Sequence, residues 1–340
     1  MSNIVANYVY EGNLKQLRDE DVRALTHLNI AFGTLQDDCT IKTDHLKLIA
    51  RADELRAINP SLKVCLSIGS GSRTAFSDTA STPEKRAAVA RSLRDIAAEY
   101  KLDGIDYDWE YPSCPSNGIA YRTEDKQNFT ALCAEIRAQL DTISDRHVLF
   151  TLATGADYYY LDFTEMDKVQ RYCDYIWLMT YDFRCGFHSL TGHHSNLYRA
   201  TGDIFRTSAA DAVRMFHDAG VPYEKMAVGC AFYSRMCVDV PDLNNGFLQY
   251  VHTNCGYGPQ YGELVENYIG KNGFTEYWDD EAKAPYLFNG NKFISYDNER
   301  SIAAKCEYAR RMGLAGVFAW DYGSDPTHTL LEAMKNGMSK

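Results

Sequence analysis

The chain has 340 residues, of which 45% are hydrophobic and 24% charged, an ordinary globular composition with no sign of disorder. Its net charge of -11 and isoelectric point near 5.3 argue against nucleic acid or an anionic membrane as the main partner, because both require a basic surface. No run approaches the roughly 18 uninterrupted apolar residues that suggest a transmembrane helix.

The sequence carries few signs of export. Its first residues, MSNIVANYVYEG, lack the basic start and apolar run of a secretory signal. We therefore expect a cytoplasmic protein as the chain stands, or a secreted one if a leader has been removed. The ten cysteines show no C-x-x-C pair and no zinc spacing. Because Cys65 and Cys230 fall within apparent strands, we expect buried, reduced thiols.

Eight apolar runs of strand character recur along the chain, with helix-like segments between most of them. The runs span residues 4–10, 25–33, 63–69, 104–110, 147–155, 174–181, 226–234 and 313–321. Helix-like segments include residues 82–100, 126–143 and 298–312. This alternation predicts an α/β fold, a parallel sheet closed as a (β/α)8 barrel, with catalytic groups at the carboxyl ends of the strands. An open, doubly wound sheet is the alternative.

One interval between the seventh and eighth strands breaks the alternation. Residues 236–292 are rich in Gly, Tyr and Asn and contain short strand-like pieces such as APYLFN. We expect a small α+β insertion here, carried by a catalytic barrel built from residues 1–235 and 293–340. An insertion at this position lies on the catalytic face of a barrel, so it would wall the substrate cleft.

Residues 103–111 read DGIDYDWEY, which places four acids within eight positions. Asp106, Asp108 and Glu110 alternate with large apolar residues in period two, the side-chain period of a strand. One face is therefore acidic, and the apolar face must pack against helices. Asp103 lies three residues before Asp106 and cannot share the acidic face. We expect it to bond backbone near the strand entrance.

The spacing of these acids has an electrostatic consequence. Alternate strand residues lie about 6.6 Å apart, and at an effective dielectric of about 20 two carboxylates at that distance repel by roughly 2.5 kcal/mol. Such repulsion raises the pKa of one carboxyl by nearly two units. A carboxyl that stays protonated near neutral pH is suited to general acid catalysis.

The stretch DGIDYDWE has the form D-x-x-D-x-D-x-E, and it resembles the signature of glycoside hydrolase family 18, the chitinases and their relatives. Four other segments resemble motifs of that family in the right order: SIGS (67–70), MTYDF (179–183), FYSR (232–235) and FAWDYGSD (318–325). The chain is similar to bacterial members over essentially its whole length. Ser70 and Ser234 depart from the glycine that the family often has, so subsite shape is expected to differ.

The resemblance implies substrate-assisted cleavage with retention, an exception to the usual pair of protein carboxylates. Glu110 would be the acid and base, and Asp108 would orient the acetamido group of the sugar. Asp106 would share a proton with Asp108, and Tyr181 would help to hold the acetamido group. The family needs no cofactor and no metal.

Seven further residues resemble the family's substrate contacts: Trp320, Asp182, Met179, Tyr233, Arg235, Tyr8 and Phe32. Trp320 would form the floor under the reacting sugar. Alternatives stay open for several of them, because Arg235 could instead pair with a neighbouring acid, Met179 could be core, and Tyr8 and Phe32 could fill the barrel.

Two adjacent histidines, His193 and His194, could suggest a metal site. Adjacent residues rarely ligate one ion without a third ligand at suitable spacing, so we expect a loop or substrate-contact role instead.

The predicted partners are chitin or N-acetylglucosamine oligosaccharides, with no nucleic acid or membrane, and we expect a monomer. A chitin-binding lectin on the same fold is one alternative, which the presence of Glu110 disfavours. An endo-β-N-acetylglucosaminidase acting on N-glycans is the other.

Overall fold

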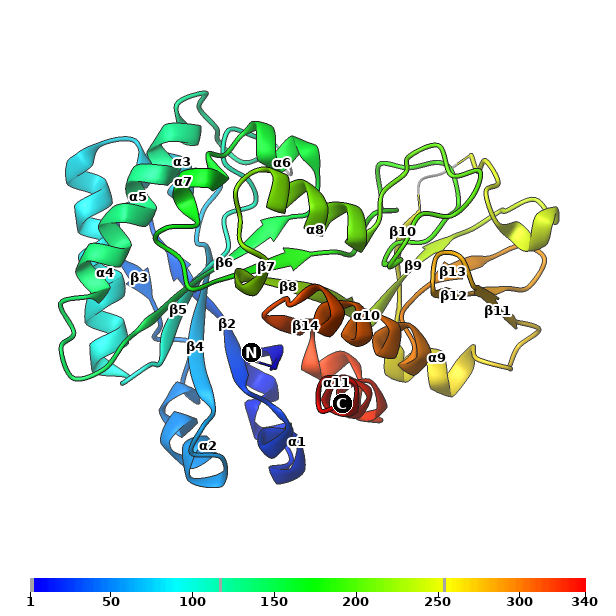
Figure 1. Ribbon diagram of the computed structural model, residues 1–340, viewed down its shortest axis with the longest axis horizontal. Helices are drawn as coiled ribbons and strands as arrows, with labels where there is room; N and C mark the ends of the chain where they lie inside the picture. Colours follow the sequence, from blue (N-terminus) through cyan, green and yellow to red (C-terminus); the bar gives the residue numbers. More distant parts are fainter. Residues whose placement is uncertain (1–2, 116–117, 253–254) are drawn as a thin grey trace.

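Eight parallel strands close into a barrel in the computed structural model, which describes residues 3–115, 118–252 and 255–340 (Figure 1). Each strand pairs with the next in the order β1-β2-β4-β5-β6-β7-β8-β14, and β14 pairs with β1. This closure confirms the predicted (β/α)8 barrel and excludes the open sheet. The strands are β1 (Ile4–Tyr10), β2 (His27–Leu35), β4 (Lys63–Ser70), β5 (Gly104–Tyr107), β6 (Leu149–Gly155), β7 (Tyr175–Met179), β8 (Met226–Ala231) and β14 (Gly316–Trp320).

Helices surround the barrel, and a two-residue strand, β3 (Ile41–Lys42), pairs antiparallel with β2. The helices are α1 (Asp19–Ala24), α2 (Ala52–Ile58), α3 (Ala75–Ala80), α4 (Pro83–Glu99), α5 (Asp125–Leu140), α6 (Tyr158–Asp162), α7 (Met166–Val169), α8 (Ala209–Asp218), α10 (Glu299–Met312) and α11 (Thr329–Met338). The three predicted helical segments correspond to α4, α5 and α10, each within a few residues.

Local capping explains where two of these helices begin and where one of them ends. The hydroxyl of Thr82 accepts a hydrogen bond from the Lys85 N–H, and proline occupies the first turn of α4. Asn298 and Ser301 form a reciprocal capping box at the start of α10. Gly313 follows α10 with φ of 70°, the left-handed conformation that glycine adopts without a steric penalty.

The apolar face of β5 packs against helices, as its alternation predicts. Ile105, Tyr107 and Trp109 are buried. The Trp109 ring stacks on Phe76 with centroids 5.6 Å apart and meets Phe129 of α5 edge-on at 5.7 Å. The acidic side chains of the same stretch must therefore point to the barrel interior.

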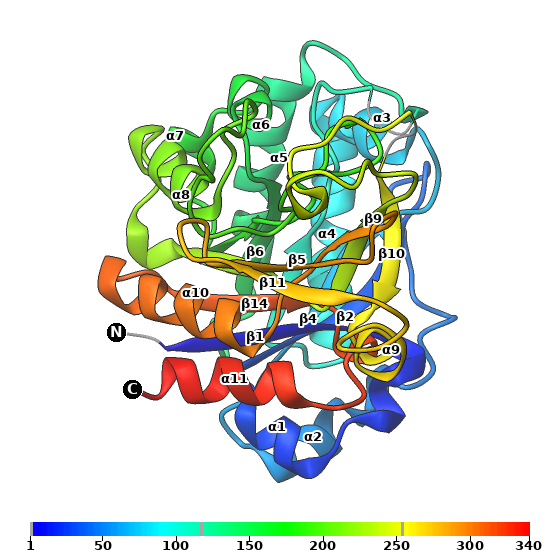
Figure 2. The ribbon, with the colours of Figure 1, turned by 90° about the vertical axis from the view of Figure 1, so that its right-hand side faces the viewer.

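A second, antiparallel sheet lies beside the barrel, at the right of Figure 1 and toward the viewer in Figure 2, and its strand order is β10-β9-β13-β12-β11. Its elements are β9 (Tyr233–Cys237), β10 (Gly256–Gln260), α9 (Tyr261–Asn267), β11 (Thr275–Asp279), β12 (Ala284–Phe288) and β13 (Phe293–Ser295). The sheet thus includes residues 233–235 and 293–295, which the predicted division assigns to the barrel. That division also covers residues 1–2, 116–117 and 253–254, which lie outside the described residues.

Two of the cysteines differ from the prediction that the thiols are reduced. Cys237 of β9 and Cys255, just before β10, form a disulfide, so the prediction of reduced thiols is wrong for this pair. Cys65 and Cys230 are free and buried, as predicted. Cys255 comes opposite Cys237 only when β10 pairs with β9, which their sequence spacing did not show.

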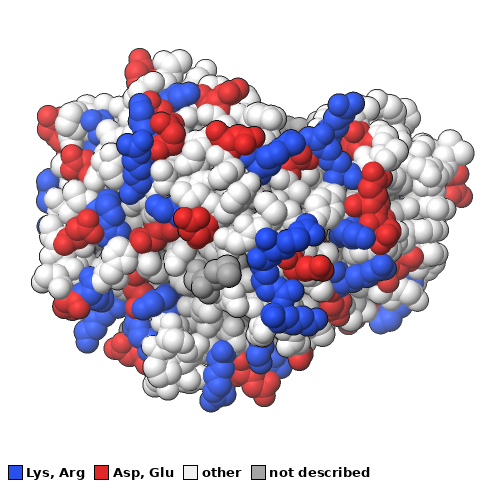
Figure 3. Space-filling model, viewed as in Figure 1, with Lys and Arg blue, Asp and Glu red and all other residues white. Residues whose placement is uncertain are grey.

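The surface mixes both signs of charge. On the face drawn in Figure 3, Lys and Arg side chains are interspersed with Asp and Glu. Of the described helices, none combines the length and the apolar composition that crossing a bilayer requires.

Candidate active site

The acidic row begins in β5 and continues past its end. Regular strand structure stops at Tyr107, three residues earlier than predicted. The Asp108 N–H still donates to the carbonyl of Ile68 (3.1 Å), so the chain keeps its course beside β4. Asp106 is fully buried, whereas Asp108 and Glu110 are partly exposed toward the carboxyl end of the barrel.

Asp106 is held by three hydroxyl groups from three strands, of which β4 and β6 are its neighbours and β1 is not. Tyr8 and Ser67 donate to its Oδ2 at 2.8 and 2.7 Å, and Thr151 donates to Oδ1 at 2.7 Å. Ser67 and Thr151 lie in register with Asp106 on β4 and β6, which places all three at one level of the barrel. Burial raises the pKa of Asp106, although these hydrogen bonds oppose the shift.

Asp108 and Glu110 both resist ionisation. Burial, followed by the charges of Glu110 and Asp106, raises the pKa of Asp108 well above its usual value. Burial also raises the pKa of Glu110, while a hydrogen bond from Tyr111 opposes that shift. The predicted direction is therefore correct for these groups, but desolvation exceeds the mutual repulsion on which the prediction relied.

Asp103 lies outside the acidic row, as predicted. Its Oδ2 accepts a hydrogen bond from the Val64 N–H (3.0 Å) at the start of β4. The guanidinium of Arg56 binds the same carboxylate at 2.8 and 3.0 Å. Asp103 therefore ties β5 to β4 and α2 at the opposite end of the strand from Glu110.

Asp182 is the centre of a second cluster, just after β7. Its Oδ1 accepts hydrogen bonds from the Tyr233 hydroxyl (2.8 Å) and from Arg235 Nε (2.7 Å), and His194 Nδ1 lies 3.6 Å away. Burial alone would raise the pKa of Asp182, but the contacts with His194 and Arg235 hold it well below its usual range. Arg235 thus forms the ion pair that the alternative interpretation anticipated.

Tyr181 stands between the two clusters. Its ring contacts Tyr233 edge-on with centroids 5.9 Å apart. Burial, followed by the charges of Asp108 and Glu110, raises the pKa of its hydroxyl well above the usual value. Room for the ring comes from Gly229 in β8, because a Cβ at that position would lie 2.7 Å from Tyr181 Cε1.

Trp320, at the end of β14, lies in an aromatic group at the mouth of the barrel. Its ring stacks on Phe32 (5.7 Å between centroids, 27° between planes) and meets Tyr8 and Tyr10 at 5.5 and 5.4 Å. Trp320 and Met179 are partly buried and pack against the cluster that fills the barrel interior. Tyr8 is buried in that cluster, so it fills the barrel and also supports Asp106.

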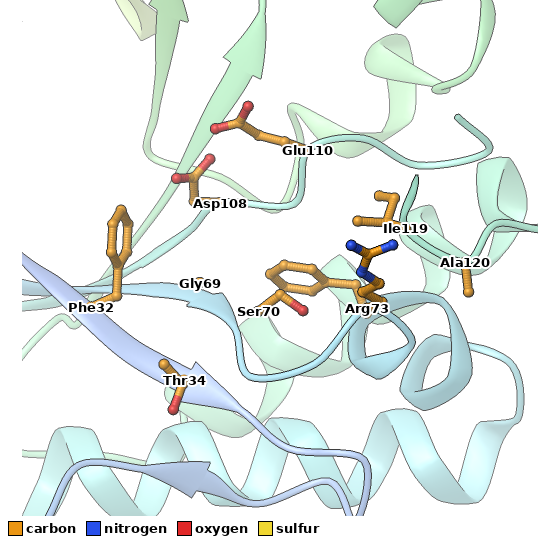
Figure 4. Close-up of a pocket in the computed structure, with 10 residues that line it drawn as sticks. Phe32, Thr34, Gly69, Ser70, Arg73, Asp108, Glu110, Ile119 and Ala120 are labelled. Carbon is orange, nitrogen blue, oxygen red and sulfur yellow. The ribbon is translucent and has the colours of Figure 1, made fainter. Parts of the chain in front are cut away.

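A cavity of about 370 Å³ opens beside Asp108 and Glu110 (Figure 4). In this view the side chain of Phe32 lies to the left of the two carboxyl groups and that of Arg73 to their right, with Ala120 farther to the right. Its lining residues are Phe32, Thr34, Gly69, Ser70, Arg73, Phe76, Asp108, Glu110, Ile119 and Ala120. Ser70, one of the two departures from the family motif, therefore lines the cavity. The other, Ser234, is buried and bonds the Pro259 carbonyl instead (2.7 Å).

Several contributors to the site were missed in the sequence. Ser67 and Thr151 reach Asp106 because β4 and β6 pair with β5 in parallel register, which the sequence does not show. Tyr111 directly follows Glu110 in the sequence, and that position is the signal that marks it. Tyr257 comes from the second sheet, and the Arg235 Cζ lies 3.6 Å from its ring centroid.

The two histidines bind different acids. His193 Nε2 lies 3.0 Å from Asp279 Oδ2 of β11, whereas His194 lies against Asp182. Both are buried in the loop between β7 and α8, which agrees with the loop role that was one of the two expected, and His194 supports Asp182 from behind. Within the described parts of the chain, no three His, Cys, Asp or Glu side chains gather in a way that could hold a metal ion.

A closed barrel with acidic side chains gathered at the carboxyl ends of its strands has the architecture of a barrel enzyme. The family model described as glycosyl hydrolases family 18 matches residues 4–325. The chain belongs to this family, which confirms the resemblance seen in its motifs.

Individual relatives resemble the chain to different extents. Chitinase A1 of Niallia circulans is 36% identical over 307 residues, covering 84% of this chain and 44% of that protein. A solved structure described as a glycoside hydrolase family 18 N-acetylglucosaminidase from Paenibacillus barengoltzii is 50% identical, with a TM-score of 0.97, and the match covers 99% of this chain and 100% of that one. Chitinase ChiW from Paenibacillus sp. str. FPU-7 is 35% identical with a TM-score of 0.91, covering 100% and 33%. The chain therefore spans less than half of Chitinase A1 and of ChiW.

Proposed function

We propose that this protein is a retaining glycoside hydrolase that cleaves β-1,4-linked N-acetylglucosamine, in chitin or chito-oligosaccharides, by substrate-assisted catalysis. The observation that carries the proposal is the row of Asp106, Asp108 and Glu110, in which burial raises the pKa of every carboxyl. Acids that keep their protons beside a partly exposed tryptophan are suited to protonating a sugar that lies on that ring.

In the first step, Glu110 gives its proton to the glycosidic oxygen as the bond from C1 to that oxygen breaks. The carbonyl oxygen of the sugar's own 2-acetamido group forms the new bond to C1. This produces an oxazolinium ion and releases the leaving sugar with its hydroxyl restored. An internal nucleophile gains a large effective molarity when it is held in line with the breaking bond.

Holding the acetamido group is the task that we assign to Asp108 and Tyr181. When the proton that the two aspartic acids share lies on Asp106, the Asp108 carboxylate accepts a hydrogen bond from the acetamido N–H and opposes the positive charge of the oxazolinium ion. Asp106 shares a proton with Asp108, and the hydroxyls of Tyr8, Ser67 and Thr151 keep it in place.

In the second step, water attacks C1 and gives a proton to Glu110, which the first step has left ionised. The acetamido carbonyl is then restored. Two successive displacements at C1 retain the β configuration. Trp320 supports the sugar from below, and Asp182, Met179, Tyr233, Arg235 and Phe32 form the surrounding contacts in this proposal.

The comparisons support N-acetylglucosamine as the reacting sugar. The structure that is 50% identical over nearly the whole chain is described as an N-acetylglucosaminidase, and Chitinase A1 carries the name of an enzyme that acts on chitin. The chain covers only 44% of Chitinase A1. The similarity therefore supports the kind of sugar that is cleaved and not the full range of substrates of that longer protein.

Product analysis on defined N-acetylglucosamine oligomers, beside a high-mannose glycopeptide, tests the proposal. Cleavage of the oligomers with an initial β anomer, followed by NMR, is the expected result. Cleavage of the glycopeptide alone would instead indicate an N-glycan enzyme. Binding of the oligomers without any cleavage would indicate a lectin, and an initial α anomer would exclude retention.

A further inference from the structure

The two ends of the cavity beside Glu110 correspond to the two sugars of the proposed reaction. Trp320, the proposed floor of the reacting sugar, stacks on Phe32 at one end of the cavity. Glu110 must stand at the oxygen that joins the reacting sugar to the leaving group. The leaving group therefore extends from Glu110 away from Phe32, toward Arg73 (Figure 4).

Arg73 has a guanidinium with no acid to neutralise it. It is exposed, and among the described residues no Asp or Glu forms an ion pair with it, whereas Arg235 at the other cluster is paired with Asp182. A guanidinium carries five N–H donors and no acceptor. A molecule that enters this end of the cavity must therefore present oxygen acceptors to use them.

The loop that carries Arg73 is fixed on both sides of the residue. The hydroxyls of Ser72 and Thr74 donate to one carboxylate oxygen of Asp37, at 2.6 and 2.8 Å. The Arg73 carbonyl accepts a hydrogen bond from the Ala120 N–H (2.7 Å) on the opposite wall. A backbone held in this way presents the guanidinium from a defined position, which lowers the entropy lost on binding.

From these observations we infer that Arg73 determines leaving-group specificity, by donating hydrogen bonds to an oxygen acceptor on the leaving sugar. That acceptor is either the acetamido carbonyl of a second N-acetylglucosamine or the carboxylate of an acidic sugar. The inference rests on the proposed function, because it takes Glu110 as the acid that separates the two sugars. Arg73 is a binding residue for the leaving group and takes no part in the proton transfers.

Three substrates with the same N-acetylglucosaminyl group and different leaving groups test this assignment. The leaving groups are N-acetylglucosamine, N-acetylmuramic acid, which adds a carboxylate, and phenol, which has no sugar oxygens. Values of kcat/KM are measured for the wild type, Arg73→Ala and Arg73→Lys. Arg91→Ala is the matched control, because Arg91 is an exposed arginine of α4 with no ion pair to a described residue and no place in the cavity lining.

For Arg73→Ala we expect kcat/KM to fall about 10- to 100-fold on at least one disaccharide and by less than about 3-fold on the phenyl glycoside, the difference that a lost charge-assisted hydrogen bond produces. The disaccharide with the larger loss identifies the acceptor. Arg73→Lys should recover part of the activity, since it keeps the charge but loses the planar fork. Arg91→Ala should match the wild type on all three substrates.

An equal fall on all three substrates, or no fall on any, would overturn the role of Arg73 while leaving the proposed function intact. An equal fall with a displaced pH profile would show that Arg73 acts through the ionisation of Glu110. If the wild-type protein cleaves none of the three substrates, and also no oligomer of greater length, the proposed function is wrong. The inference about Arg73 then fails with it.

Discussion

Glu110 is the residue on which turnover should depend most strongly. Glu110→Gln keeps the size and polarity of the side chain but cannot donate the proton that the leaving oxygen needs. We expect kcat on N-acetylglucosamine oligomers to fall by about 10² to 10⁴ while oligosaccharide binding persists. Steady-state kinetics and calorimetric titration measure the two quantities. Undiminished turnover would show that another group is the acid.

Tyr111 should adjust the pH range of the same acid. Its hydrogen bond to Glu110 favours the ionised carboxylate and so lowers the pKa of Glu110. Tyr111→Phe removes that bond, so the pKa of Glu110 should rise. Because Glu110 must be protonated to act, the alkaline limb of the kcat/KM profile should move to higher pH. A limb that moves to lower pH would contradict the assigned hydrogen bond.

At the scale of elements, one buried ion pair joins three parts of the barrel. The Lys305 ammonium of α10 lies 2.6 Å from Asp297 Oδ2 and donates to the Ser195 hydroxyl at 2.6 Å. Asp297 also accepts from the Ala231 N–H (2.9 Å) at the end of β8. These contacts tie α10 and β8 to the loop that contains His194, which supports Asp182.

Lys305→Met should be strongly destabilising, because it leaves the fully buried Asp297 without its counter-charge. We expect a loss of about 3 to 5 kcal/mol in the free energy of unfolding, measured by urea denaturation. Adding Asp297→Asn should recover part of that loss. Lys283→Met removes an exposed partner of Asp280 and should leave the denaturation midpoint close to that of the wild type. Similar losses from both lysine substitutions would contradict a special role for burial.

At the scale of the whole molecule, His27 should affect acid stability. Burial, followed by the charge of Lys63, lowers the pKa of His27 to about 4 from its usual 6.5. The unfolded chain therefore takes up a proton before the folded one does, and stability falls as the pH drops from about 6.5 to about 4.

Replacing His27 with glutamine removes this titration. Between pH 7 and pH 4.5, the wild type should lose about 2 to 3 kcal/mol more stability than His27→Gln does. Urea denaturation of both proteins at the two pH values measures the difference. Equal losses would show that His27 takes up its proton as readily in the folded protein as in the unfolded chain.

The amino-acid sequence alone was sufficient to predict the barrel. Its strands read as apolar runs with helix-like segments between most of them, because both faces of a parallel sheet are buried, and helical spacing marks those segments. The split of residues 103–110 into an acidic and an apolar face also follows from period two. Asp103 and Trp109 were predicted correctly for this local reason.

Only the tertiary structure showed which residues meet across strands. The hydroxyls of Ser67 and Thr151 reach Asp106 through strand register, and the disulfide of Cys237 with Cys255 forms through pairing of two strands of the second sheet. Such contacts depend on distances between segments that lie far apart in the chain. The pKa of Asp108 also depends on the packed molecule. Desolvation raises it more than the repulsion that the sequence spacing predicts.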